Sequence, residues 1–193
     1  MRPLDGNPAE RGRTGRWWLT YCDGDALGLS YVTRTARLGD VDGLARVHAA
    51  SALVGYADIF PPEAPKPTSE LLAPGWARLL QNANAAVLVA VADDIIVATA
   101  AVIPDDDVPC GITLARLYVD PTCWRQGIGS VLHDHAVQVA AHRGAHGLNL
   151  WVLEDNHTAR SMYERRGWRL IPGRTRGNDT PGVVDVLYQL ALL

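Results

Sequence analysis

The sequence predicts an α/β fold in which helices cover both faces of a central mixed β-sheet. The hydrophobic pattern gives one strand, two helices, three strands, and then a helix, a strand, a helix and two strands. The segment Gly111–Ser130 (GITLARLYVDPTCWRQGIGS) has the pattern of a strand, a turn and a helix start, and the segment Gly147–Trp168 again places a strand before a helix. Strands and helices in this order are typical of a sheet with helices on both sides.

Length and composition fit one globular domain. A chain of 193 residues is long enough for a full-sized core, and its net charge of −3 argues against the basic surface of most nucleic-acid-binding proteins. No window approaches the roughly 18 apolar residues of a membrane-spanning helix, and the N-terminal segment lacks the apolar part of a signal peptide. Three widely spaced cysteines without a C-x-x-C pair favour a reducing compartment. We therefore expect a cytoplasmic protein that binds neither nucleic acid nor membrane.

Residues 1–30 are expected to form an N-terminal arm before a single domain over residues 31–193. The first fifteen residues contain proline, glycine and charge with little apolar content, which is typical of a loosely docked segment. Within the arm, Trp17–Tyr21 and Leu27–Val32 predict an extra hairpin.

The elements of the domain follow from periodicity, caps and turn signals. Asp40 is a plausible cap for the first helix, Thr68 or Ser69 for the second, and the segment Val54–Pro67 between them is too rich in proline for regular structure. The expected elements are strand Tyr31–Thr35, helix Val41–Ala52, helix Glu70–Leu80, a hairpin of strands Val87–Val91 and Ile95–Val102, strand Ile112–Val119, helix Gly127–His142, strand Gly147–Val152, helix His157–Arg166, strand Arg169–Ile171, a loop Pro172–Gly182 and strand Val183–Leu192. The last strand is apolar and ends the chain, so we expect it near an exposed edge that a second subunit covers in a homodimer.

The helix Gly127–His142 is expected to bury one face. Its apolar positions recur at steps of four, three and four, at Ile128, Leu132, His135 and Val139. His133 and His135 are two positions apart, so they point to different sides of the helix and cannot hold one ion together. We therefore expect no metal site.

A candidate phosphate-binding loop lies where this helix begins. Gly127 and Gly129 allow close approach to the unpaired N–H groups and partial positive charge of a helix N-terminus, and Arg125 adds a cation. A P-loop is excluded because no Lys followed by Ser or Thr is present, and the dinucleotide fingerprint fails at Leu132. The pyrophosphate loop of an acyl-CoA enzyme and a glycine-rich helix start without a ligand remain.

Two motifs together resemble the GNAT superfamily of N-acetyltransferases. The acetyl-CoA motif of that family, Q/R-x-x-G-x-G/A, aligns with Trp124–Gly129, with Trp124 in place of the usual Gln or Arg. The downstream motif, N-x-x-A-x-x-x-Y-E-x-x-G-F/W, is matched at Asn156, Ala159, Tyr163, Glu164, Gly167 and Trp168. Two motifs in the right order are far more specific than either alone. The resemblance covers residues 31–193 and implies a GNAT-like mixed sheet.

The resemblance implies transfer of the acetyl group of acetyl-CoA to a primary amine by direct attack in a ternary complex. The pyrophosphate would bind the loop, and the pantetheine arm would bind the strand end Leu117–Val119, where this strand and Gly147–Val152 splay apart. The residues expected at the cofactor are Leu117, Tyr118, Val119, Arg125, Gln126, Gly127, Ile128, Gly129, Ser130, Asn156 and Tyr163. No metal is implied.

Tyr163 is the main catalytic candidate, because a phenol can donate a proton to the departing thiolate. Without the motif, packing would explain this tyrosine equally well. Many relatives carry a general base, Glu, at the position of Thr113. Here Tyr118, a water chain, or an acid such as Asp58 or Glu63 must substitute, or no dedicated base exists.

The acceptor is expected to be a small-molecule amine or a peptide N-terminus. In the family its pocket is built by the region of the first two helices and by the loop before the final strand. Those segments supply Tyr56, Asp58, Phe60, Glu63 and Trp76, and then Arg174, Arg176 and Asp179. Aromatic residues with carboxylates suit a cationic amine, although a core position explains Phe60 or Trp76 equally well. The alternative function is a catalytically silent acyl-CoA-binding sensor or interaction module, which the intact Tyr163 disfavours and Thr113 keeps open.

Overall fold

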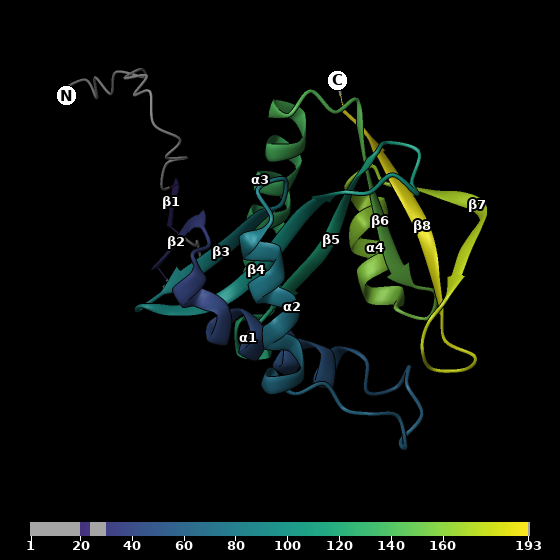
Figure 1. Ribbon diagram of the computed structural model, residues 1–193, viewed down its shortest axis with the longest axis horizontal. Helices are drawn as coiled ribbons and strands as arrows, with labels where there is room; N and C mark the ends of the chain where they lie inside the picture. The colour runs from purple at the N-terminus through teal and green to yellow at the C-terminus, as the bar shows by residue number, and fades with distance from the viewer. Residues whose placement is uncertain (1–19, 24–29, 193) are drawn as a thin grey trace.

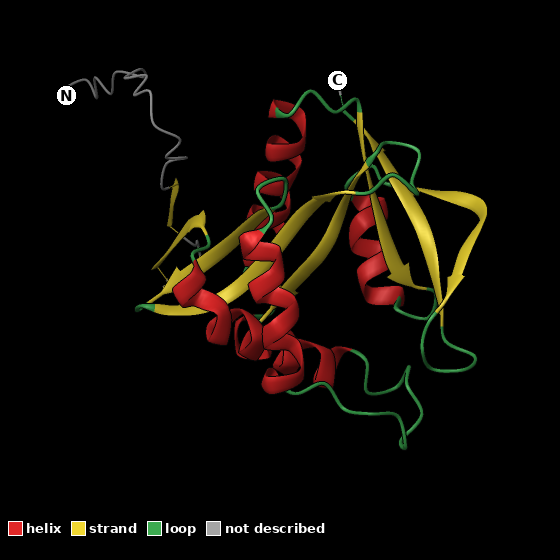
Figure 2. Cartoon of the chain, viewed as in Figure 1, coloured by secondary structure: helices red, strands yellow, loops and turns green. Residues whose placement is uncertain are grey.

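The computed structural model describes residues 20–23 and 30–192, which form one eight-stranded sheet with helices on both faces (Figures 1 and 2). In chain order the elements are β1 (Thr20–Asp23), β2 (Ser30–Thr35), α1 (Val41–Gly55), α2 (Ser69–Gln81), β3 (Ala86–Ala92), β4 (Ile95–Pro104), β5 (Ile112–Val119), α3 (Ile128–His142), β6 (Gly147–Leu153), α4 (His157–Arg165), β7 (Arg169–Gly177) and β8 (Val184–Ala191), with short 3₁₀ turns at Leu38–Asp40 and Pro121–Cys123. The strand order is β1-β2-β3-β4-β5-β6-β8-β7. Among the described strands only β5 and β6 pair in parallel, so the predicted mixed sheet is confirmed.

Of the predicted N-terminal hairpin, the described residues show the antiparallel pair β1 and β2, which overlaps the predicted strands Trp17–Tyr21 and Leu27–Val32 only in part. Thr20 lies opposite Thr33, and Asp23 lies opposite Ser30. The strand predicted at Tyr31–Thr35 is the same strand β2, which therefore pairs with both β1 and β3. Trp17 and Trp18 lie outside the described residues, and the division into an arm and a domain stays a prediction.

Helices α1 and α2 cover one face of the sheet, where fully buried Leu44, Val47 and Trp76 pack on β3 and β4. Thr68 caps α2 as predicted, because its hydroxyl oxygen accepts a hydrogen bond from the backbone N–H of Leu71 at 3.4 Å. Asp40 stands at the N-cap position of α1 as predicted, but the capping contact expected of its side chain is absent from the described structure. The Asp40 carboxylate makes no capping hydrogen bond to α1; it binds Arg34 at 2.7 Å and the backbone N–H of Arg37 at 2.6 Å.

Helices α3 and α4 pack on the opposite face (Figure 1). The buried stripe of α3 runs in steps of four through Ile128, Leu132, Ala136 and Ala140. The expected face through His135 and Val139 is therefore partly wrong, since both are only half-buried. The small side chains of Ala136 and Ala140 allow the helix to lie close to the sheet. The helix therefore turns these alanines, and not the larger His135 and Val139, toward the core.

The last strand lies next to an edge of the sheet, as predicted, but it is not itself the edge strand. β8 lies between β6 and β7, and its residues Val186, Leu187 and Tyr188 are buried. The edge is instead β7, which continues to Gly177 through most of the segment expected to be a loop. The reason for expecting a dimer through β8 is thereby removed. No helix in the described ranges has the length and apolar character needed to cross a membrane.

Candidate active site

The parallel strands β5 and β6 part toward their C-terminal ends. Thr113 opposite Asn149 is the one paired position between them, and Figure 1 shows the two strands diverging beyond it. The buried Asn149 side chain secures this point, because it accepts from the backbone N–H of Cys110 at 2.9 Å and donates to the carbonyl of Tyr188 at 3.1 Å. Beyond this pair, the backbone N–H and C=O groups on the β6 side of β5 are not paired with another strand. The splayed strands expected from the resemblance are therefore present.

A β-bulge interrupts β5 just after this point. Ala101 and Val102 of β4 are adjacent, but they pair with Arg116 and Leu114, so Ala115 is an extra residue. Alternating side chains point to opposite faces of a strand, and one extra residue exchanges the two faces.

The bulge decides which side chains face which helices. Leu114 before the bulge and Leu117 and Val119 after it all pack toward α3. Arg116 and Tyr118 therefore face α1 and α2 on the other side of the sheet, where Arg116 lies over Trp76 and Tyr118 packs in the cluster of that face.

The glycine-rich loop presents backbone N–H groups at the start of α3. Gly127 is the N-cap with φ of 79°, and Arg125 also has a positive φ of 63°. The N–H groups of Ser130 and Val131 turn back to the carbonyl of Gly127. Within the described chain the N–H groups from Arg125 to Gly129 have no acceptor. Such an array at a helix N-terminus favours an anion.

Trp124, which departs from the family motif, ties this loop to the end of β5. Its indole N–H donates to the carbonyl oxygen of Val119 at 2.7 Å. At Gly129 an added Cβ would lie 3.1 Å from Cγ2 of Val119, so this glycine also lets α3 pack closely on the strand. The sequence could not show the role of Trp124, because its partner is set by the turn geometry.

Tyr163 lies on α4 with its ring buried against Trp168, at 5.7 Å between ring centroids, and near His133. Its hydroxyl has no hydrogen-bond partner within the described chain. Burial, with a smaller contribution from Tyr118, raises the pKa of Tyr163 above its ordinary value. The phenol therefore keeps its proton at neutral pH and can act as a donor.

Two motif neighbours of Tyr163 have structural contacts. The side-chain oxygen of Asn156 caps α4 by accepting from the backbone N–H of Ala159 at 3.1 Å, which leaves its amide group for a ligand. Glu164 accepts from the Tyr188 hydroxyl at 2.6 Å, so it holds α4 to β8.

Tyr118 lies within hydrogen-bonding reach of Tyr56, at the end of α1, and near Tyr163. Burial raises the pKa of Tyr118, although Tyr56 and Arg116 lower it in part. A base that works near neutral pH needs the opposite shift, so this environment disfavours Tyr118 as the base, and its catalytic role stays a prediction. His48 stacks on the Tyr118 ring at 3.9 Å, and burial followed by the charge of Arg116 lowers the pKa of His48 to about 3.

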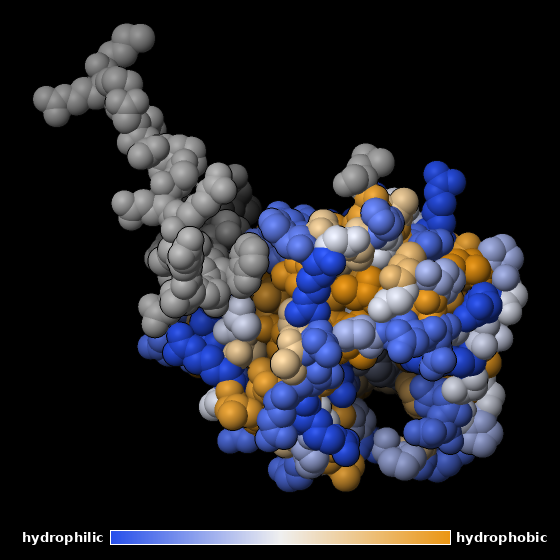
Figure 3. All heavy atoms as spheres, turned by 45° about the horizontal axis from the view of Figure 1, so that its top comes forward, coloured by the Kyte–Doolittle hydropathy of each residue, from blue (hydrophilic) through white to orange (hydrophobic). Residues whose placement is uncertain are grey.

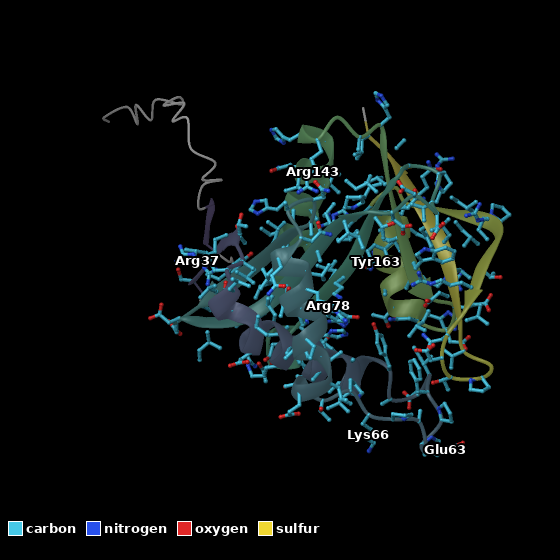
Figure 4. The ribbon with its side chains drawn as sticks, viewed as in Figure 1. Arg37, Glu63, Lys66, Arg78, Arg143 and Tyr163 are labelled. Carbon is cyan, nitrogen blue, oxygen red and sulfur yellow. The ribbon has the colours of Figure 1, made fainter. Side chains whose placement is uncertain are left out.

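The other predicted acceptor residues do not all converge on these tyrosines. Phe60 is half-buried against Tyr56, with ring centroids 6.0 Å apart. Asp58 and Glu63 are exposed, and Figure 4 shows Glu63 at the tip of the loop after α1, away from Tyr163. Trp76 is fully buried, which supports its interpretation as a core residue. Arg174 and Arg176 lie on the edge strand β7 rather than in a loop, and Asp179 follows it.

Thr113 offers no base. It is buried, and its hydroxyl donates to the Asp105 carboxylate at 3.0 Å. Asp185 of β8 was not predicted from the sequence; it is a buried carboxylate opposite Leu153 at the open end of β6. It accepts from Arg176 at 2.9 Å, and its charge contributes to the raised pKa values of Tyr56 and Tyr118. A single acid within the apolar strand VDVLYQLA was the signal that could have found it.

An opening lies between the half with α1 and α2 and the half with β7 and β8 (Figure 3). Two cavities of about 470 and 370 Å³ lie elsewhere, toward the C-terminal end of α3, and Arg143 borders both. No cluster of three or more His, Cys, Asp or Glu side chains suited to a metal occurs in residues 20–23 and 30–192.

Comparison with known proteins places this geometry in a family. Residues 51–168, more than half of the chain, match the acetyltransferase (GNAT) family. No curated protein sequence matches the chain. A PaiA N-acetyltransferase from Thermoplasma acidophilum in complex with coenzyme A superposes with a TM-score of 0.66 at 23% identity, covering 85% of this chain and 100% of that one. The ribosomal-protein-S18-alanine N-acetyltransferase from Escherichia coli gives a TM-score of 0.61 at 21% identity, covering 83% and 93%.

A putative streptothricin acetyltransferase from Bacillus anthracis in complex with acetyl coenzyme A gives a TM-score of 0.52 at 19% identity, covering 60% of this chain and 66% of that one. At such identities these structures show a shared fold. Together with the match of the family from the end of α1 through α4, they establish that the chain belongs to the acetyltransferase (GNAT) family and is an acyltransferase.

Proposed function

We propose that this protein transfers the acetyl group of acetyl-CoA to a primary amine by direct attack within a ternary complex. The observation that carries the proposal is that β5 and β6 part between two features: the glycine-rich loop, whose backbone N–H groups are free to bind an anion, and the buried Tyr163. The acceptor is a small-molecule amine or a peptide N-terminus, and the reaction takes place in the cytoplasm.

The cofactor would lie along the open edge of β5. The free N–H groups from Gln126 to Gly129, with Ser130 at the first turn of α3 and the cation of Arg125, suit the pyrophosphate. The unpaired edge at Leu117–Val119 suits the amides of the pantetheine arm, as a partner strand would. The carbonyl oxygen of Val119 already accepts a hydrogen bond from Trp124. The backbone N–H groups of this strand end are still available, and they can polarise the thioester carbonyl.

Chemistry would proceed by attack of the neutral amine on the thioester carbonyl carbon. A carbon–nitrogen bond forms, the carbon–sulfur bond breaks, and the thiolate takes a proton from the Tyr163 hydroxyl. The amine nitrogen loses its own proton to water or to a nearby base. The charge of Asp185 contributes to the raised pKa values of Tyr56 and Tyr118. We therefore take Asp185, rather than Asp58 or Glu63, as the candidate general base.

The test is thiol release from acetyl-CoA across a panel of amines, beside calorimetry of acetyl-CoA binding. We expect binding in the micromolar range and turnover of at least one amine. A second candidate function, a silent acyl-CoA-binding module, is favoured by the lack of a base at Thr113. Binding without thiol release on any amine would support that module, and the absence of binding would contradict both functions.

A further inference from the structure

Arg116 is a half-buried cation that meets no anionic side chain among residues 20–23 and 30–192. The bulge in β5 turns it toward α1 and α2, where its guanidinium carbon lies 4.3 Å from the centroid of the Trp76 ring. Its Nη1 atom is enclosed, and the guanidinium makes no hydrogen bond or ion pair within the described chain. Arginines elsewhere in the fold do have partners, such as Arg34 with Asp40 and Arg176 with Asp185. An enclosed, unpaired cation is unfavourable unless a ligand completes it.

A second unpaired arginine lies beside it on α2. An added Cβ at Gly75 would lie 3.3 Å from Nη2 of Arg116, and Arg78 is three residues later on the same side of the helix. Burial lowers the pKa of Arg116, Tyr118 raises it in part, and the nearby charge of Arg78 lowers it further. The Arg78 side chain has no acidic partner in the described ranges either. Figure 4 shows Arg78 on the side of α2 that faces α4 and Tyr163.

Other polar atoms at this corner are also unsatisfied. The Trp76 indole nitrogen and Nδ1 of His48 are enclosed and have no hydrogen-bond partner in the part of the chain that the structure describes, and the two rings meet edge to face at 6.1 Å. Enclosed polar atoms without partners in one place indicate that a polar group is missing there.

The corner adjoins the tyrosine cluster. Arg116 and Tyr118 are two positions apart on β5 and face the same side, so their Cα atoms are roughly 7 Å apart. Tyr118 in turn lies near Tyr163. A group bound at the arginines and an amine at the open strand ends are therefore close enough to belong to one small molecule.

We propose that the acceptor is an amino acid, a primary amine that carries a carboxylate, and that Arg116 and Arg78 bind this carboxylate. The proposal rests on the proposed N-acetyltransferase function. Arg116 would form the closer, partly desolvated pair, and the exposed Arg78 would add attraction at the entrance.

The experiment compares each common L-amino acid with its own carboxamide as acceptor, with rates expressed per concentration of neutral amine. We expect kcat/KM for the preferred acid to exceed that of its amide by about 100-fold, since a site built for a charged group rejects the analogue that lacks it. Arg116→Met keeps the length of the apolar stem and removes the charge. It should reduce the acid-to-amide ratio about 10-fold or more while the dissociation constant of acetyl-CoA stays unchanged.

Arg37→Met is the matched control, because it removes one positive charge at an exposed position far from Tyr163 in Figure 4. This variant should keep the wild-type ratio. If acetyl-CoA fails to bind, the proposed function itself fails. If acetyl-CoA binds, three results overturn the carboxylate site: amides react as well as acids, Arg116→Met slows both series equally, or neither free amino acids nor amides bind or react. Selective turnover of peptide N-termini without a nearby carboxylate would also overturn it.

Discussion

Tyr163 and Tyr188 both pack at α4, but their hydroxyl groups differ in their partners. The Tyr188 hydroxyl donates to Glu164 and accepts from Arg160 at 3.0 Å, whereas that of Tyr163 has no partner in the described chain. Tyr163→Phe should lower turnover by roughly ten- to a thousandfold with little effect on acetyl-CoA affinity, the range expected on losing one general acid. Tyr188→Phe, the control, should instead cost about 1 kcal/mol of unfolding free energy and retain turnover. Equal turnover of Tyr163→Phe and the wild type would return Tyr163 to a packing role.

Arg125 has a left-handed backbone, which is unfavourable by roughly 1 kcal/mol for a residue with a Cβ. Arg125→Gly removes this strain together with the cation of the loop. Asp94→Gly makes the same backbone change at φ of 62° in the turn between β3 and β4. Without ligand, both variants should melt within about 2 °C of each other. Only Arg125→Gly should weaken acetyl-CoA, by roughly 5- to 30-fold in calorimetry, as expected for one lost charge-assisted contact. Unchanged affinity would exclude Arg125 from the pyrophosphate site.

At the scale of elements, the contact of α1 with β5 makes the unfolding free energy depend on pH. His48 is neutral in the folded protein because its pKa is about 3, whereas an unfolded histidine titrates near 6.5. Between these values the unfolded chain binds the extra proton, so the unfolding free energy falls as pH falls. The expected loss from this group is about 2 kcal/mol at pH 5.

Denaturant unfolding at pH 7 and pH 5 measures this loss, with His48→Phe as the comparison. Phenylalanine preserves a ring against Tyr118 and cannot take up a proton, so the variant should lose about 2 kcal/mol less than the wild type over the same step. Parallel losses in the two proteins would show that His48 is not the responsible group.

At the scale of the whole molecule, the pH dependence of the rate follows from where its titratable groups lie. The pKa values of Tyr118 and Tyr163 are raised and that of His48 is lowered, so none of the three titrates near neutrality. Without another base, only neutral amine reacts, which for a lysine-like pKa near 10.4 is about one part in a thousand at pH 7.4. We expect kcat/KM to rise with pH to about 9 and to follow the pKa of the acceptor.

A pH–rate profile on two acceptors of different pKa checks this expectation. An inflection near pH 7 that stays in place for both acceptors would mean that the enzyme supplies a base. In that case Asp185→Asn should abolish the inflection, and Asp58→Asn, at an exposed position, should leave it in place.

Local features of the sequence were sufficient for the element order and for finding the glycine-rich loop and Tyr163, whose roles stay predictions. Hydrophobic periodicity and caps such as Thr68 act within a few residues, so they are readable without the fold. The two motifs are also local. Each is a single strand-to-helix unit, and the glycines and polar residues of that unit set its geometry. The hairpin of β3 and β4 was found for the same reason.

Strand pairing was decided only by the tertiary structure. The position of β8 inside the sheet, the extra residue at Ala115 and the approach of Asp185 to the tyrosines all depend on contacts between distant segments. A one-residue change in register moves every later side chain to the other face, and no local pattern reports it. For this reason Arg116 could not be assigned from the sequence: the bulge places it on the face of α1 and α2, where no carboxylate of the described chain meets it.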